Sequence, residues 1–98
     1  MEAAEIKRRM SVHLKFTEHA RVAMLDDDLV VDDVVHAIEQ DEILERYPDA
    51  KPFQSCLVLG RARDGRPLHV VCSLPGHVDM LIIVTAYLPT EEGWIDFR

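Results

Sequence analysis

The side chains best suited to proton transfer and phosphate binding lie in the C-terminal half of this sequence. His69 sits in an apolar run, Thr85 and Tyr87 lie two residues apart in another, and Arg61 and Arg66 flank a turn between them. Imidazole can act as a general acid or base near neutral pH. Hydroxyl groups can donate hydrogen bonds to a developing charge, and arginine can bind a phosphate through two donors. Together these groups suit cleavage of a phosphodiester by the neighbouring 2′-hydroxyl, which needs no metal or other cofactor.

The same residues also have purely structural interpretations. His69 would then be a strand histidine held by hydrogen bonds, and Tyr87 a half-buried sheet aromatic. Arg61, Arg63 and Arg66 would be solvated residues near a hairpin tip. The sequence leaves both interpretations open.

The remaining metal-binding residue types lack the spacing of a metal site. Cys56 and Cys72 form no CxxC pair and are most simply small apolar core residues. His13, His36 and His77 are scattered. The acidic run at residues 26–28 lacks the glycine and terminal glutamate of a calcium loop. We therefore expect no bound metal.

Length and composition predict one domain over residues 1–98. The chain is 48% hydrophobic and 30% charged, which is typical of a globular protein. We expect a peripheral helix within residues 1–11 and a core over residues 16–97. The first residues lack the apolar region of a secretory signal, and the longest apolar run, residues 80–88, is far short of the roughly 20 residues that span a membrane. The sequence thus predicts a cytoplasmic protein with no membrane association.

The charge is unevenly distributed along the chain. The formal net charge is −7, which counts against nonspecific binding to nucleic acid. Residues 1–52 hold 13 acids and 7 bases, whereas residues 53–98 hold 5 acids and 4 bases. A local basic rim on the C-terminal half is therefore compatible with the negative total.

Helical patterns occupy the first part of the chain. A short charged helix is expected over residues 2–10, and residues 12–16 alternate as a short extended segment. Thr17 is suited to cap a helix that carries Ala20, Ala23 and Met24 on its apolar face and ends at the aspartates of residues 26–28. A second helix begins at Val31 or Asp32 and runs to about residue 40. The acids in its first turn favour the positive end of the helix dipole.

Strand patterns follow, at residues 42–47, 55–62, 67–73 and 80–88. Asp64 and Gly65 between the second and third are a strong hairpin signal. Trp94, Ile95 and Phe97 form an apolar tail that is expected to pack onto the domain. Helices followed by strands predict an α+β fold, with N-terminal helices on a four-stranded, mainly antiparallel sheet.

The hairpin also predicts which side chains share a face. If Asp64 and Gly65 are its two loop residues, Gly60 lies opposite His69. The face with Leu57, Leu59, Arg61, Leu68, Val70 and Cys72 is the bulkier and should carry the helices. The other face, with small residues around His69, would form a shallow pocket floor. A bulge of one residue would exchange the faces.

An ordered set of motifs spans Phe16 to Trp94. The strings are FTEHARVAM, VDDVVHAI, EILERYPD, FQSCLVLG, GRPLHVV and IIVTAYLP, followed by a tryptophan. In this order they resemble the domain-of-unknown-function family DUF4258. The resemblance implies a likeness to small bacterial toxins of the RelE and MqsR kind, within the barnase, EndoU, colicin and RelE superfamily. Some such proteins occur beside zinc-finger antitoxins of the MqsA type.

The resemblance also implies a layout and a site. Helices would precede a four-stranded antiparallel sheet, and a metal-independent site would lie on the sheet face. The positions that fit the polar motif residues are His19, Arg21, Arg66, His69, Thr85 and Tyr87. One departure from the pattern is the net charge, because such ribonucleases tend to be basic.

Two functional hypotheses follow. In the first, the chain is a toxin-like endoribonuclease acting on RNA. His69 would be the general acid or base, with His19 as a second proton-transfer group. Arg61 or Arg66, with Arg21, would bind the substrate, and Thr85 and Tyr87 would stabilise the transition state.

In the second hypothesis, the chain is a non-catalytic module that binds an antitoxin-like protein or a second copy of itself as a homodimer. The local charge around His69 discriminates between the two. A ribonuclease should show a continuous positive patch there despite the negative total, whereas a binding module should show an apolar or acidic one.

Overall fold

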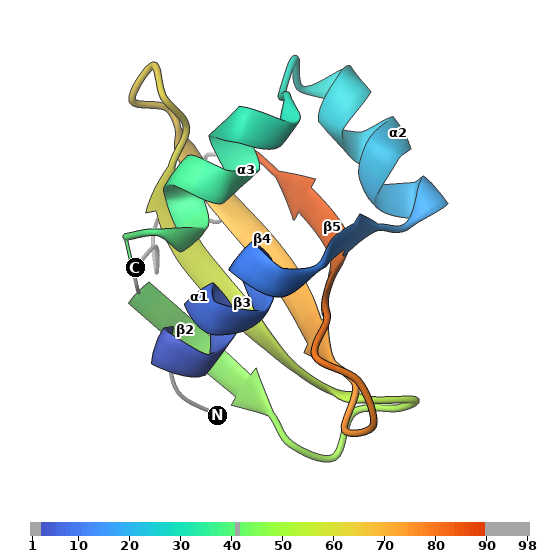
Figure 1. Ribbon diagram of the computed structural model, residues 1–98. Coiled ribbons are helices and arrows are strands. Elements are labelled where there is room, and N and C mark those ends of the chain that lie inside the picture. The colour runs from blue at the N-terminus through green and yellow to red at the C-terminus, as the bar shows by residue number, and fades with distance from the viewer. Residues whose placement is uncertain (1–2, 41, 90–98) are drawn as a thin grey trace.

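The protein is a mixed α+β structure, as the order of the sequence patterns predicts. The computed structural model describes residues 3–40 and 42–89 (Figure 1). The helices are α1 (Ala3–Val12), α2 (Glu18–Asp26) and α3 (Val31–Ile38), and the strands are β1 (Leu14–Phe16), β2 (Glu42–Tyr47), β3 (Gln54–Arg61), β4 (Pro67–Leu74) and β5 (Leu81–Tyr87). The expected tail at Trp94, Ile95 and Phe97 lies outside the described residues. None of the helices in these ranges has the length and apolar character needed to cross a membrane.

The sheet has five strands, so the expectation of four is wrong by one. The strand order is β1-β5-β4-β3-β2, and β1 runs parallel to β5 while the other pairs are antiparallel. The extended segment expected near residues 12–16 is this extra strand. Its three residues are too few to show a clear alternation of apolar and polar side chains. Leu14 is a strand residue because it pairs with Leu81 of β5.

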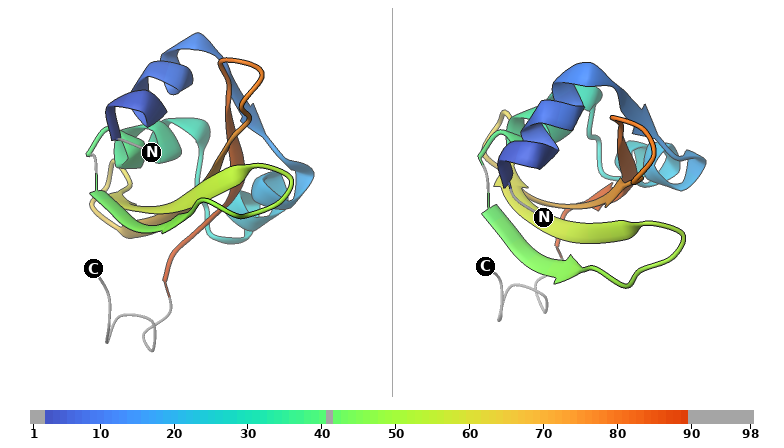
Figure 2. Two further views of the ribbon diagram at one scale, coloured as in Figure 1. Left: turned by 90° about the horizontal axis from the view of Figure 1, so that it is seen from below. Right: turned by 60° about the horizontal axis from the view of Figure 1, so that its bottom comes forward.

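The helices α1 and α3 cover one face of the sheet, as Figure 2 shows. The third helix, α2, packs along β5. The core lies between the helices and the sheet. Its buried apolar residues include Ile6 from α1, Val34, Ala37 and Ile38 from α3, and Cys56, Val58, Leu68, Val70 and Ile83 from the strands. No helix in the described ranges covers the opposite face.

Polar side chains form hydrogen bonds at the start of α2 and at the start of α3. Thr17 caps α2 as predicted, because its Oγ1 accepts a hydrogen bond from Ala20 N at 3.0 Å. The buried carboxylate of Asp33 accepts from Val30 N at 3.0 Å and from Arg63 N at 3.1 Å. Both hydrogen bonds lower the pKa of Asp33, and the bond from Val30 N has the larger effect. They tie the start of α3 to the β3–β4 hairpin. The helix ends at Ile38, two residues before the predicted end.

The β3–β4 hairpin forms where it was predicted, but its register is different. Ala62 N donates to Arg66 O at 2.8 Å and Gly65 N donates to Ala62 O at 2.9 Å, which leaves three loop residues, 63–65, rather than two. Gly65 has a φ of 94°, in the left-handed region that a loop of this type requires. Leu59 consequently pairs with His69, and Gly60 pairs with Leu68.

This shift corrects the predicted faces. Because side chains alternate, the Gly60 position now faces the helices with Leu68, while Leu57 and Leu59 share the opposite face with His69. Gly60 therefore makes no room above His69. It lets β3 approach α3, since a Cβ on Gly60 would lie 2.2 Å from the carbonyl oxygen of Ala37.

Candidate functional site

His69 and Tyr87 are direct neighbours on the sheet face that lies opposite the helices. They pair across β4 and β5, and their ring centroids are 5.5 Å apart with an edge-to-face angle of 76°. Nε2 of His69 is shielded from solvent. The pairing of β4 with β5 therefore places the two rings together.

Thr85 lies on the same face. It pairs with Val71, which is two residues along β4 from His69, and Thr85 is two residues before Tyr87. A bulge between Val71 and Cys72 changes the register beyond this point. The structure thus brings the imidazole and two hydroxyl groups onto neighbouring positions of two adjacent strands.

The partly buried position of His69 sets its protonation state. Burial lowers the pKa of His69 below its ordinary value of 6.5, because removing water disfavours the charged imidazolium. The imidazole is therefore mainly neutral at pH 7. A neutral imidazole can accept a proton, so the site holds a base rather than an acid at rest.

This shift predicts a loss of stability in weak acid. The unfolded chain binds a proton on His69 near pH 6.5 and the folded chain only at lower pH, so the free energy of unfolding falls as pH decreases through and below 6.5. Urea unfolding between about pH 7.5 and pH 5.5 should show a steeper fall for the wild type than for His69→Gln. Parallel curves for the two proteins would mean that His69 is not shielded.

The arginines differ in their availability for a substrate. Arg61 shares the face of His69 by strand alternation, is exposed, and donates from Nη1 to Gly65 O at 2.9 Å. Among the described residues it forms no ion pair. Arg66 instead donates to the carboxylate of Asp64 at 2.8 Å and to the carbonyls of Asp27 at 3.0 Å and Asp28 at 3.2 Å. Arg66 therefore joins the hairpin tip to the end of α2.

His19 and Arg21 lie apart from this set. Both are exposed on the first turns of α2, and Arg21 lines a groove between α2 and the start of α3. Within the described part of the chain, neither forms a hydrogen bond or ring contact with His69 or Tyr87. Their predicted roles in substrate handling stay predictions.

Two acidic side chains that the sequence patterns did not predict here share the face of His69. Glu42 pairs with Leu59 and Glu45 pairs with Leu57, although they are three residues apart, because β2 has a bulge between Ile43 and Glu45. The carboxylate of Glu45 accepts a hydrogen bond from the hydroxyl of Tyr47, and this bond raises the pKa of Tyr47 to about 12. Without the bulge, alternation along β2 would place Glu42 and Glu45 on opposite faces of the sheet.

The positive charge near the hairpin tip is largely compensated. Nε of Arg63 lies 3.6 Å from a carboxylate oxygen of Asp33, and Nη1 lies 3.8 Å from one of Asp32. Arg66 pairs with Asp64. By strand pairing, the described residues on the face of His69 include apolar Leu57, Leu59 and Val71, the exposed bases Arg61 and Lys15 on separate strands, and the acids Glu42 and Glu45, so they form no continuous basic patch.

The cysteines belong to the core rather than to this site. Cys56 and Cys72 are free, fully buried and opposite one another on the helix side of the sheet. Hydrogen bonding to Cys56 and burial raise the pKa of the Cys72 thiol. Within residues 3–40 and 42–89, no group of three His, Cys, Asp or Glu side chains is placed to hold a metal ion.

These features define a small α+β protein whose one sheet carries helices on one face and a histidine–tyrosine pair on the other. The chain belongs to the family described as domain of unknown function (DUF4258), whose model matches residues 16–88. The match includes His69, Thr85, Tyr87 and Arg61 and begins after α1. Neither the curated proteins nor the solved structures gave a match to this chain.

Proposed function

We propose that this protein is a toxin-like, metal-independent endoribonuclease whose site is the sheet face around His69. The observation that supports the proposal is the direct pairing of His69 with Tyr87, with Thr85 on the same face. A neutral imidazole beside a hydroxyl group is the combination that base-catalysed phosphodiester cleavage needs.

Groups on this face can accept and supply the protons that the reaction moves. His69 takes the proton of the ribose 2′-hydroxyl as the 2′-oxygen attacks phosphorus. The bond from phosphorus to the 5′-oxygen breaks, and that oxygen takes a proton from the Tyr87 hydroxyl or from water. The products are a 2′,3′-cyclic phosphate and a 5′-hydroxyl. His19 is the second proton-transfer candidate, and its exposed place on α2 requires the substrate to reach past β5.

The remaining residues stabilise charge. Arg61 is the arginine that we assign to the phosphate, because its guanidinium is exposed on the correct face while that of Arg66 is held by Asp64 and two carbonyls. Thr85 and Tyr87 would donate hydrogen bonds to the phosphorane oxygens. Such donors are most effective where they are already oriented, as on paired strands.

Expression in bacteria tests the proposal. Tightly controlled induction of the wild type should arrest growth and degrade RNA, whereas His69→Ala should not. With purified protein and a defined RNA in chelator, His69→Ala should lower the cleavage rate by about 10²–10⁴-fold and leave the cyclic-phosphate product undetected.

Two further variants keep this experiment interpretable. His13→Ala changes an exposed histidine on the connection from α1 to β1 and should cleave like the wild type. Tyr87→Phe keeps the ring beside His69 and removes only the hydroxyl. A lower cleavage rate in this variant would therefore be due to the missing hydroxyl and not to altered packing. Folded wild-type protein that neither cleaves RNA nor slows growth would contradict the proposal.

A second candidate function is a non-catalytic protein-binding module. The observation that favours it is the character of the face around His69, where Leu57, Leu59 and Val71 lie near the acids of β2 and no continuous basic patch is formed by the described residues. In this case an antitoxin-like protein or a second copy of the chain would cover the face. Harmless expression of the wild type, with a partner bound across β3 and β4, would support it.

A further inference from the structure

A groove lies on the helix side of the molecule, away from the face of His69. It has a volume of about 610 Å³ and runs between α2, the end of β1 and the start of α3. Its lining residues are mainly apolar and include Phe16, Met24, Leu25, Leu29 and Val31. Phe16 also packs against the core, so the floor of the groove is continuous with the fixed interior.

Exposed apolar side chains gather around this groove. Leu25 is 78% exposed, Val30 51%, Val22 49% and Val31 48%. Leu25, Val30 and Val31 line the groove, and Val22 lies on α2 three residues before Leu25. Contiguous exposed apolar surface of this kind marks interaction sites, whereas single exposed residues need no explanation.

The rim of the groove is acidic. Glu18 and Arg21 line the groove and their charges cancel, whereas the exposed Asp26, Asp28 and Asp32 each directly follow or precede a lining residue in the chain. Asp32 is paired with Arg63 at 3.8 Å, so Asp26 and Asp28 are the acids that give this rim its net negative charge. The neighbouring Asp27 is also negative, but its carboxylate accepts from Leu88 N at 3.0 Å and holds the end of β5. Among the described residues, the carboxylates of Asp26 and Asp28 form no ion pair, so these two exposed groups are the ones open to an external cation.

We propose that this groove binds a basic amphipathic segment of a partner protein. Apolar side chains of the segment would fill the space between Leu25 and Val31, and its lysines or arginines would pair with Asp26 and Asp28. A helix is the form that presents apolar and basic residues on two such faces, as in the helix-in-groove mode of recognition.

The rim charge argues against other occupants. RNA and an anionic membrane would be repelled by the aspartates. A second copy docked through the same patch would bring the carboxylates of Asp26 and Asp28 against the same carboxylates of its partner, and this like-charge contact is destabilising. A basic protein segment is the occupant for which both the apolar floor and the acidic rim contribute favourably.

A designed peptide provides the first test. The probe is a fluorescent Leu/Lys helix of about four turns, compared with a Leu/Glu helix of the same leucine spacing. We expect the Leu/Lys helix to bind the full chain, with amide shifts confined to α2, the start of α3 and Phe16. The Leu/Glu helix should not bind, and added salt should weaken the complex.

Two variants distinguish binding of the peptide in the groove from general electrostatic attraction to an acidic protein. Leu25→Ser should weaken binding by about tenfold or more, because it removes the most exposed apolar contact. The control Val12→Ser changes another exposed apolar residue, on α1 and 59% exposed, and should leave the affinity unchanged.

Three results would overturn the inference. They are an absence of binding, equal weakening by Leu25→Ser and Val12→Ser, and self-association of the chain that Leu25→Ser abolishes. The last would assign the groove to a second copy instead. None of these outcomes depends on RNA cleavage, since the groove and the face of His69 lie on different sides of the sheet.

Discussion

Replacement of Gly60 by alanine is expected to lower the free energy of unfolding by about 3 kcal/mol or more. A Cβ at this position would lie 2.2 Å from the oxygen, 2.5 Å from the Cα and 2.6 Å from the carbonyl carbon of Ala37. All three are backbone atoms of α3, so no flexible side chain can move aside. The helix must separate from β3, and the contacts of Val34, Ala37 and Ile38 with the sheet would be lost together.

Gly76→Ala is the matched control. A Cβ on Gly76 would have no heavy atom within 4 Å, and the residue is exposed in the turn between β4 and β5. Its effect should stay within about 0.5 kcal/mol. Gly65 cannot serve as the control because its φ of 94° strains any other residue. Urea unfolding followed by circular dichroism measures both variants. Equal stability of the two would show that α3 does not pack this closely on β3.

The second large effect is expected at Arg9, which connects α1 to the β4–β5 turn. Nε of Arg9 donates to the carboxylate of Glu5 at 2.8 Å, and Nη1 donates to the carbonyl oxygens of Pro75 at 2.7 Å and Met80 at 3.1 Å. The side chain is only 10% exposed. These bonds hold the turn that leads into β5, and thus the strand that carries Tyr87.

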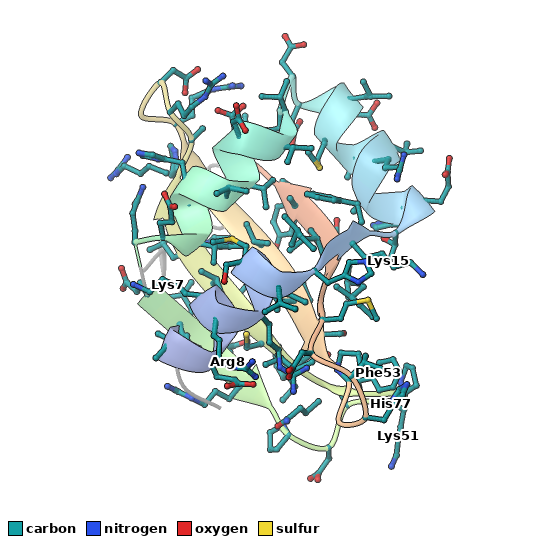
Figure 3. All side chains as sticks on the ribbon, viewed as in Figure 1. Lys7, Arg8, Lys15, Lys51, Phe53 and His77 are labelled. Carbon is teal, nitrogen blue, oxygen red and sulfur yellow. The ribbon has the colours of Figure 1, made fainter. Side chains whose placement is uncertain are left out.

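Arg9→Met keeps the apolar stem and leaves the carbonyls without this donor. Hydrogen bonds from a charged donor contribute about 1.5–3 kcal/mol each, so we expect a loss of about 3 kcal/mol in the free energy of unfolding. The neighbour Arg8, labelled in Figure 3, provides the control, because it pairs with Glu5 and Asp79 from a side chain that is 47% exposed.

Arg8→Met should cost less than about 1 kcal/mol, as exposed ion pairs usually do. Thermal or urea unfolding of both variants measures the difference. If Arg9→Met were as mild as Arg8→Met, the buried bonds of Arg9 would contribute little, and α1 would be a dispensable cover on the sheet.

The two candidate surfaces depend on the same framework. Arg66 and Asp33 both join the β3–β4 hairpin to the α2–α3 connection, through the carbonyls of Asp27 and Asp28 and through Arg63 N. The hairpin carries Arg61 and His69, and the connection forms part of the groove. A ligand that ordered one surface would therefore act on residues that also support the other.

The amino-acid sequence by itself determined the elements of this protein and the identity of its candidate groups. The α2 cap at Thr17, the hairpin around Gly65 and the order of helices before strands follow from local preferences, which act between residues close together in the chain. The polar residues of strands β4 and β5 were recognisable for the same reason, because alternation along a strand is a local rule.

Only the tertiary structure decided which of these groups meet. The third loop residue of the hairpin exchanged the faces of β3, and a bulge in β2 moved Glu45 beside Leu57. Arg66 donates a hydrogen bond to the carbonyl oxygen of Asp27 at the end of α2, and β1 enters the sheet by pairing with β5. Each outcome is a contact between residues distant in sequence, and such contacts are selected by the packing of helices on the sheet rather than by any local preference.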